Sequence, residues 1–140
     1  MAVEKKYELW VKNVKDKELK NELLEIQKNE SEKYERFYKD LEFGTAGMRG
    51  IMGAGSNRMN IYTVRKAAQG LANYLLKFSK KSGVVISFDS RNNSKTFAED
   101  AARVLAANGV KVYITKSLKP TPVLSFLIRK LGTDAGIMIT

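Results

Sequence analysis

The sequence predicts an α/β fold, with a mostly parallel mixed sheet between flanking helices in three α/β/α layers, preceded by an N-terminal helical arm. Two observations predict it. From residue 63 onward, short apolar runs alternate with amphipathic helical segments, and the runs recur about every 25 residues, the rhythm of βαβ units. Before residue 42 the apolar residues instead recur at helical spacing, without any strand-like run.

The arm, residues 1–41, is predicted to form three helices. Asp16 and Asn29 are suitable N-caps that divide it, and Glu32 follows Asn29 by three residues, as in a capping box. Its inward face is expected to consist of Tyr7, Trp10, Val11, Val14, Leu19, Leu23, Ile26, Tyr34, Phe37, Tyr38 and Leu41.

Residues 42–140 are predicted to form the α/β domain. It opens with a glycine-rich stretch, residues 42–60, in which we expect a short strand around Arg49–Met52. Three further strands are predicted from buried apolar runs at Val84–Phe88, Val110–Ile114 and Ala135–Ile139.

Three helices are expected between and before these strands. Thr63, Ser94 and Thr121 are the predicted N-caps, with Pro122 at the first helical position of the last helix. Gly109 and Gly132 are expected just beyond the C-terminal ends of the second and third helices, where a left-handed residue is common.

Parallel strands joined by right-handed crossovers place their carboxyl ends at one edge of the sheet, where open α/β sheets bind ligands. Residues 89–94, residues 115–121 and whatever follows Thr140 should therefore meet there. Because the sequence stops at the end of a predicted buried strand, we interpret it as truncated before the loop that would carry the chemistry.

Composition narrows the chemistry. The sequence has no cysteine and no histidine, so disulfides, thiolate metal sites and Ser-His or Cys-His catalysis within this chain are excluded. No apolar run is long enough to cross a bilayer, and no secretory signal opens the chain, so we expect a cytoplasmic protein without a membrane partner.

Charge is unevenly distributed. Residues 44–140 carry 15 basic and only 4 acidic side chains, whereas residues 1–43 carry 10 and 11. Residues 44–140, the basic body of the chain, should attract anions, either phosphorylated small molecules or nucleic acid. The charge is equally consistent with solubility and a missing acidic partner or domain.

Two segments could contact an anion. In Gly44-Thr45-Ala46-Gly47-Met48-Arg49-Gly50, glycines would let backbone N–H groups approach a phosphate and Arg49 could add a charge-assisted fork; the alternative is a structural turn. Arg91, after the strand that ends near Asp89, could reach an anion, but a local pairing of Asp89 with Arg91 is the favoured interpretation.

The segment Leu41–Gly55, followed by Asn57-Arg58-Met59-Asn60, closely resembles the opening signature of phosphohexomutases of the phosphoglucomutase/phosphomannomutase type. It is most similar to the subgroup with bacterial phosphoglucomutases and phosphopentomutase-like enzymes. Further matches follow in order over essentially the whole chain: Tyr62-Thr63-Val64-Arg65, Asp89-Ser90-Arg91 with Ser94, Pro120-Thr121-Pro122 and Gly136-Ile137-Met138-Ile139-Thr140.

The resemblance implies the first of four domains of an isomerase that interconverts hexose 1-phosphate and 6-phosphate through a hexose bisphosphate, using a phosphoserine and Mg²⁺. The phosphoserine would lie just after Thr140, so no catalytic residue and no metal ligand is expected within the chain, which alone should be inactive. Thr45 and Arg49 match family positions near substrate and phosphoserine, within the loop glycines Gly44, Gly47 and Gly50. Ala46 stands where some relatives have tyrosine.

Two alternatives remain. The basic body could bind nucleic acid, although no RNA-binding sheet motif accompanies its aromatic residues. The arm could instead serve as an oligomerisation element, and self-association through exposed apolar surface is also expected. The sequence does not indicate which sugar phosphate, glucose, mannose or pentose, the whole enzyme would prefer.

Overall fold

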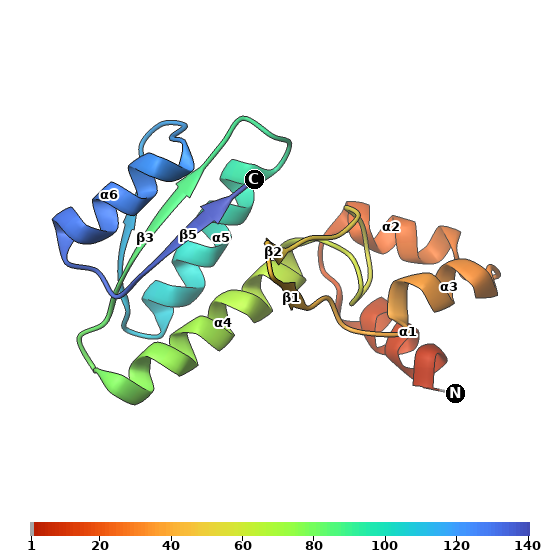
Figure 1. The fold of residues 1–140 in the computed structure, drawn as a ribbon. Helices are drawn as coiled ribbons and strands as arrows, with labels where there is room; N and C mark the ends of the chain where they lie inside the picture. Colours follow the sequence, from red (N-terminus) through yellow and green to blue (C-terminus); the bar gives the residue numbers. More distant parts are fainter. Residues whose placement is uncertain (1) are drawn as a thin grey trace. The chain divides into compact units, whose positions relative to one another are not determined.

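The computed structural model describes residues 2–140, which divide into two compact units, one ending at Thr63 and the other spanning Val64–Thr140. The first unit contains helices α1 (Ala2–Asn13), α2 (Lys17–Glu25) and α3 (Glu30–Phe37), followed by strands β1 (Phe43–Gly44) and β2 (Gly47–Met48) (Figure 1). The long helix α4 (Ile61–Phe78) begins in this unit and continues into the second.

The three helices of the arm enclose a small apolar core. Phe37 lies at its centre, and the rings of Tyr7 and Trp10 meet it edge-on at centroid distances of 5.9 and 5.7 Å. Its buried members are Tyr7, Val14, Leu23, Ile26, Phe37 and Ala54, the last from the glycine-rich segment. The predicted three-helix arm is therefore correct, and the glycine-rich segment contributes to its core. Tyr34 and Tyr38, expected on the inward face, are instead exposed.

Both predicted N-caps of the arm are confirmed. The Asp16 carboxylate accepts a hydrogen bond from the Leu19 N–H at 3.0 Å, and the Asn29 side chain accepts one from the Glu32 N–H at 3.1 Å. The Glu32 carboxylate pairs with Arg36 one turn later, at 3.0 Å.

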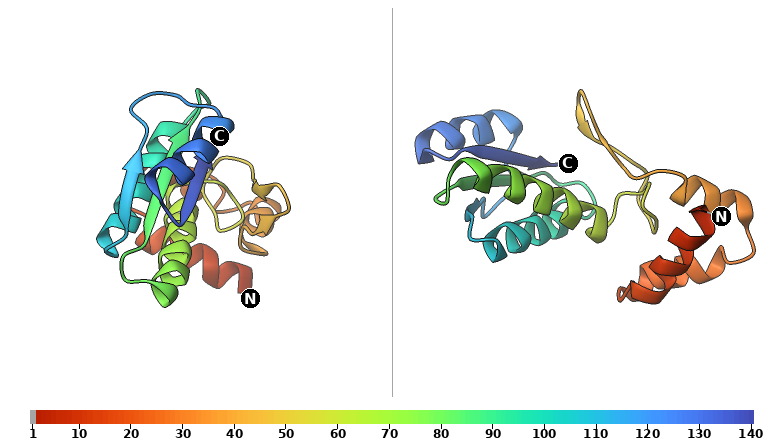
Figure 2. Two further views of the ribbon diagram at one scale, coloured as in Figure 1. Left: turned by 60° about the vertical axis from the view of Figure 1, so that its left-hand side comes forward. Right: turned by 90° about the horizontal axis from the view of Figure 1, so that it is seen from below.

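The strand predicted around Arg49–Met52 is wrong. The structure has a tight antiparallel hairpin just before it, in which Phe43 pairs with Met48 and Gly44 with Gly47. Gly47, which follows the turn residues Thr45 and Ala46, has φ 95°, a backbone conformation that favours glycine. Of the predicted strand, only Met52 makes a ladder contact, an isolated bridge to Met59. The hairpin extends away from the three helices of its own unit (Figure 2).

The second unit is a three-layer sandwich. Its strands are β3 (Gly83–Phe88), β4 (Lys111–Ile114) and β5 (Ala135–Ile139), all parallel, in the order β4-β3-β5. Helix α5 (Ser94–Ala107) packs beside α4 on one face and α6 (Thr121–Leu131) covers the other (Figures 1 and 2). Strand β3 is central and buried along its whole length. The predicted α/β/α fold and parallel strands are confirmed.

Three predicted helix starts are displaced. Helix α4 begins at Ile61, because Asn60 accepts hydrogen bonds from the Tyr62 and Thr63 N–H groups at 3.0 and 3.1 Å. The Thr63 hydroxyl accepts in return from the Asn60 N–H at 3.0 Å. Asn93, in the left-handed region at φ 63°, precedes α5, and Pro120 precedes α6, so Thr121 and Pro122 are its first two residues.

The predicted glycine ends are correct. Gly109, at φ 85°, follows the C-cap Asn108 of α5, and Gly132 closes α6 at φ 62°. In the described part of the chain, no helix is long and apolar enough to cross a membrane.

Candidate functional site

Asp89 organises the carboxyl edge of the sheet in the second unit. It follows β3 directly, and its backbone N–H donates to the Ile139 carbonyl at the end of β5, at 3.2 Å. Its Oδ1 accepts hydrogen bonds from the Ser94 hydroxyl at 2.9 Å and the Arg91 N–H at 3.0 Å. Its Oδ2 accepts one from the Thr140 hydroxyl. One carboxylate thus links the ends of two strands to the start of α5.

These contacts favour the charged form of Asp89. The Thr140 hydroxyl first, and then the Arg91 backbone N–H, hold the pKa of this carboxyl below its ordinary value. The side chain is 30% exposed, so it remains in contact with water. At this edge the carboxylate is therefore a fixed negative charge at neutral pH.

Arg91 is held loosely beside it. Its Nε lies 3.7 Å from Asp89 Oδ2, and its side chain is 76% exposed. The favoured interpretation of a local Asp89–Arg91 pairing agrees with this geometry. The guanidinium nevertheless has donors left over for an anion at the strand ends.

The segment after β4 reaches the same edge, as predicted. The Lys119 N–H donates to the Phe88 carbonyl at 3.1 Å, and the buried Ser87 hydroxyl donates to the Lys119 carbonyl at 3.3 Å. The loop therefore folds back over the end of β3. Thr115 Oγ1, which is buried, has no hydrogen-bond partner among the described residues.

The glycine-rich candidates lie in the first unit, on and just after the hairpin. Gly44, Thr45, Gly47, Arg49 and Gly50 are all exposed. A Cβ on Gly50 would approach the Leu41 side chain to 2.8 Å, so the chain passes close to the start of the hairpin there. Among the described residues, the Arg49 guanidinium has no ion pair or hydrogen bond. It is a solvated cation on a short, glycine-flanked hairpin.

The predicted site residues thus fall in different units, those of the hairpin in the first and Arg91 in the second. Sequence reasoning missed the side chains that hold each group. Ser94 and Thr140 secure Asp89, while Glu22, Arg36 and Asn60 secure the segment that follows the hairpin. Asn60 and Ser94 carry a sequence signal, since each is an N-capping residue type just before an amphipathic helix.

Comparison with known proteins decides the family. Residues 40–140 match the family model described as "Phosphoglucomutase/phosphomannomutase, alpha/beta/alpha domain I". The chain belongs to this family. It is 46% identical over 132 residues to a phosphoglucomutase of Staphylococcus saprophyticus, covering 94% of this chain and 24% of that protein. Phosphoglucomutases of two Staphylococcus aureus strains, MRSA252 and USA300, are 44% and 43% identical over 133 residues, 95% of this chain and 24% of theirs.

The chain spans about a quarter of the length of these phosphoglucomutases. The domain I match includes the hairpin, Asp89, Arg91 and Thr140, and it begins close to the domain boundary predicted after residue 41. The compact units divide later, after Thr63. The boundary at residue 41 therefore stays a prediction.

The side chains described here do not suit a magnesium ion. Mg²⁺ prefers carboxylate oxygens together with water and phosphate. Within residues 2–140, no three Asp, Glu, His or Cys side chains gather at one place. Asp89, the carboxylate at the strand ends, is already engaged by three donors. No catalytic step can be assigned to a metal on these residues.

Proposed function

We propose that this chain forms domain I of a phosphohexomutase, which interconverts hexose 1-phosphate and hexose 6-phosphate. One observation carries the proposal: a solvated Arg49 on a glycine hairpin, within a segment that matches the domain I model. The membership of the family and the phosphoglucomutase names of the relatives support it.

In this proposal a phosphoserine just after Thr140 gives its phosphoryl group to the free hydroxyl of the sugar phosphate. The serine O–P bond breaks and a sugar O–P bond forms, while the sugar hydroxyl loses its proton and the serine oxygen takes one up, which yields a hexose bisphosphate and a free serine. The second phosphoryl group then returns to the serine, so the net reaction moves phosphate between C1 and C6. Phosphoryl transfer of this kind depends mainly on positioning and on charge stabilisation.

The residues of this chain have distinct parts in the proposal. The Arg49 guanidinium neutralises charge on the transferred group, and Thr45 and the N–H groups near Gly44, Gly47 and Gly50 approach its oxygens. Arg91 contributes positive charge at the strand ends. Asp89 holds Thr140, and with it the start of the serine loop, in place. Mg²⁺ would be held elsewhere in the whole enzyme, and a cytoplasmic location remains a prediction.

The proposal predicts activity in the whole enzyme and none in the 140-residue chain, which spans a quarter of its relatives. The test is conversion of glucose 1-phosphate to glucose 6-phosphate by both purified proteins. In the whole enzyme, Arg49→Ala should lower kcat/KM by about 10² to 10³-fold, the usual loss for one such donor. Arg49→Lys should recover part of it, since lysine keeps the charge without the planar fork.

Thermal unfolding is the control for Arg49, whose exposed side chain should contribute less than about 0.5 kcal/mol to stability. Near-normal kcat/KM in Arg49→Ala would remove Arg49 from the site. Mutase turnover by the 140-residue chain, free of host enzyme, would contradict the proposal that the phosphoserine and the Mg²⁺ site lie outside it.

A further inference from the structure

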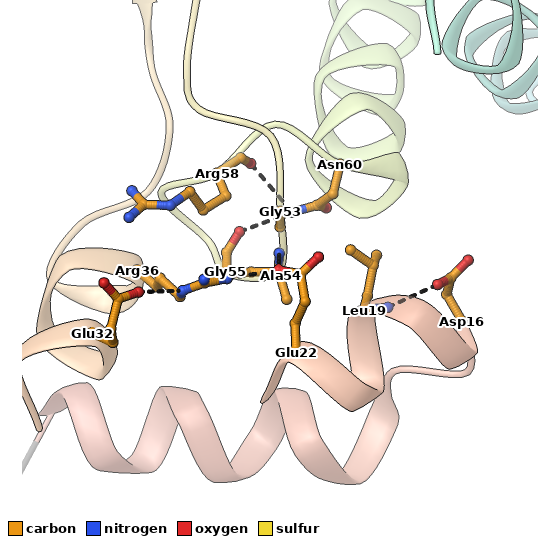
Figure 3. Close-up of polar contacts among 10 residues, drawn as sticks. All are labelled: Asp16, Leu19, Glu22, Glu32, Arg36, Gly53, Ala54, Gly55, Arg58 and Asn60. Carbon is orange, nitrogen blue, oxygen red and sulfur yellow. Dashed lines mark hydrogen bonds and ion pairs between the residues drawn. The ribbon is translucent and has the colours of Figure 1, made fainter. Parts of the chain in front are cut away.

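The segment that follows the hairpin rests on a polar cluster at the ends of three helices. Glu22 comes from α2, Arg36 from α3 and Asn60 from the residue before α4, and all three surround residues 53–55 (Figure 3). We call these three side chains the loop clamp. They lie within the first unit and are far apart in the sequence.

Glu22 and Arg36 together bind both backbone groups of Ala54. Glu22 Oε2 accepts from the Ala54 N–H at 3.0 Å, and Arg36 Nη1 donates to the Ala54 carbonyl at 3.1 Å. The two side chains also pair with each other at 2.8 Å. Arg36 is only 16% exposed and is held on its other side by Glu32. Glu22 is 37% exposed, so only the arginine side of the pair is largely desolvated. Charge-assisted hydrogen bonds of this kind are short and directional.

Asn60 binds the same segment from the opposite side. Its buried Nδ2 donates to the carbonyls of Gly53, Gly55 and Arg58, at 2.8, 3.0 and 3.3 Å. Its Oδ1 accepts from the N–H groups of Tyr62 and Thr63 in the first turn of α4. The Asn60 side-chain amide therefore connects residues 53–55 to the start of α4, and both its nitrogen and its oxygen are hydrogen-bonded.

Backbone hydrogen bonds also hold the chain on both sides of the hairpin and Arg49. Before the hairpin, the Leu41 N–H donates to the Ser56 carbonyl at 2.8 Å. After it, the Met59 N–H donates to the Ile51 carbonyl at 2.8 Å. Since Leu41 and Ile51 flank the hairpin, both of its ends are joined to residues 56–59, which directly follow the clamped segment 53–55. The clamped segment is tightly seated: a Cβ on Gly55 would lie 2.7 Å from the Arg36 carbonyl oxygen.

We propose that Glu22, Arg36 and Asn60 are positioning residues that fix the base of the hairpin and so direct Arg49 for phosphoryl transfer. The inference rests on the proposed function of Arg49. It assigns a task to the helical arm other than oligomerisation, because α2 and α3 supply two of the three clamp side chains.

The test is a mutant cycle in the whole enzyme, with Glu22→Ala, Arg49→Ala and the double variant. If Glu22 acts through Arg49, Glu22→Ala should lower kcat/KM about 10- to 100-fold, as small misplacements of a catalytic group do. In the Arg49→Ala background the same change should cost less than about 3-fold, because coupled residues are not additive. Glu22→Gln, which keeps an acceptor for Ala54, should restore part of the loss.

Asp16→Ala is the matched control. Asp16 caps the same helix, α2, and among the described residues its side chain makes no hydrogen bond to residues 53–55 (Figure 3). The substitution therefore weakens the arm without releasing residues 53–55. Its kcat/KM should stay within about 3-fold of wild type at temperatures well below unfolding. An equal loss in Asp16→Ala, or equal factors for Glu22→Ala in both backgrounds, would overturn the proposal.

Hydrogen exchange in the same proteins separates this inference from the proposed function. Glu22→Ala should speed amide exchange at Ala54 and over residues 47–59, and Asp16→Ala should not. If wild type shows no mutase activity, the proposed function fails, and unchanged exchange over residues 47–59 would overturn the clamp by itself.

Discussion

At the scale of single residues, Asp89 and Arg49 show two ways of holding a charge. Asp89 accepts hydrogen bonds from Ser94, Arg91 and Thr140, so its position is fixed by its own contacts. Arg49 is placed only through the backbone of its hairpin. The Asp89 carboxylate therefore organises a strand end, whereas the Arg49 guanidinium is exposed to solvent.

The contacts of Asp89 predict a dependence of stability on pH. Because its pKa is lowered in the folded chain, its contribution is fully present above the ordinary carboxyl pKa, about 3.9, and is lost as the pH falls through the folded value. Asp89→Asn should therefore lower the urea midpoint at pH 7, and the difference from wild type should shrink below about pH 4. Urea unfolding from pH 7 to pH 3 measures this.

Thr140→Val is the companion variant, since it removes the hydroxyl that contributes most to the shift. Its difference from wild type should shrink over the same acid range. A difference for Asp89→Asn that stays constant down to pH 3 would mean that the carboxylate gains nothing from its partners.

At the scale of elements, the sequence predicts the strands that form continuous apolar runs, but it does not predict the short hairpin or the helix starts that single side chains determine. The buried runs place β3, β4 and β5 to within one residue, because a buried strand is a continuous apolar segment. The hairpin was missed because each strand has only two residues, too few for any pattern. Helix α4 starts earlier than predicted because Asn60, and not Thr63, caps it. Helix α5 is preceded by Asn93 because the hydroxyl of the predicted cap, Ser94, binds Asp89 instead.

The same limit applies to the candidate site. Arg49, Thr45 and the loop glycines could be proposed from composition and resemblance, since they lie in one continuous segment. The loop clamp could not, because Glu22, Arg36 and Asn60 meet only after three helices have packed. From the sequence alone, Glu22 and Arg36 cannot be distinguished from the other charged residues on the helix surfaces.

Two glycines give a matched test of the helical elements. At both Gly70, inside α4, and Gly109, after α5, an added Cβ would have no atom within 4 Å beyond the local backbone and the neighbouring residues. They differ in backbone, since only Gly109 is left-handed, at φ 85°. Gly70→Ala should stabilise the 140-residue chain by about 0.5–1 kcal/mol. Gly109→Ala should destabilise it by about 1–2 kcal/mol.

Thermal and urea unfolding of the two variants measure the difference, with identical chemistry as the internal control. Equal signs for both substitutions would show that backbone conformation does not decide the cost at these positions.

At the scale of the whole molecule, two properties oppose each other. The net charge of +10 makes copies of the chain repel. Large apolar side chains are nevertheless exposed: Phe43 in the hairpin and Ile51 just after it are 71% and 69% exposed, and Phe78 at the end of α4 is 73% exposed. Exposed apolar surface favours association. Salt screens the repulsion and leaves the apolar attraction in place.

The 140-residue chain should therefore self-associate reversibly at high concentration, and more strongly at 0.5 M than at about 0.05 M salt, since the screening length falls severalfold over that range. Sedimentation velocity at several protein concentrations measures it. Phe43→Ser and Phe78→Ser, each at an exposed position, should weaken association without lowering the unfolding temperature. Nucleic-acid binding would show the reverse dependence, because releasing counterions makes affinity fall steeply as salt rises. A strict monomer at high concentration and high salt would contradict the expected association, and tight, salt-sensitive DNA binding would favour the nucleic-acid alternative for the basic body.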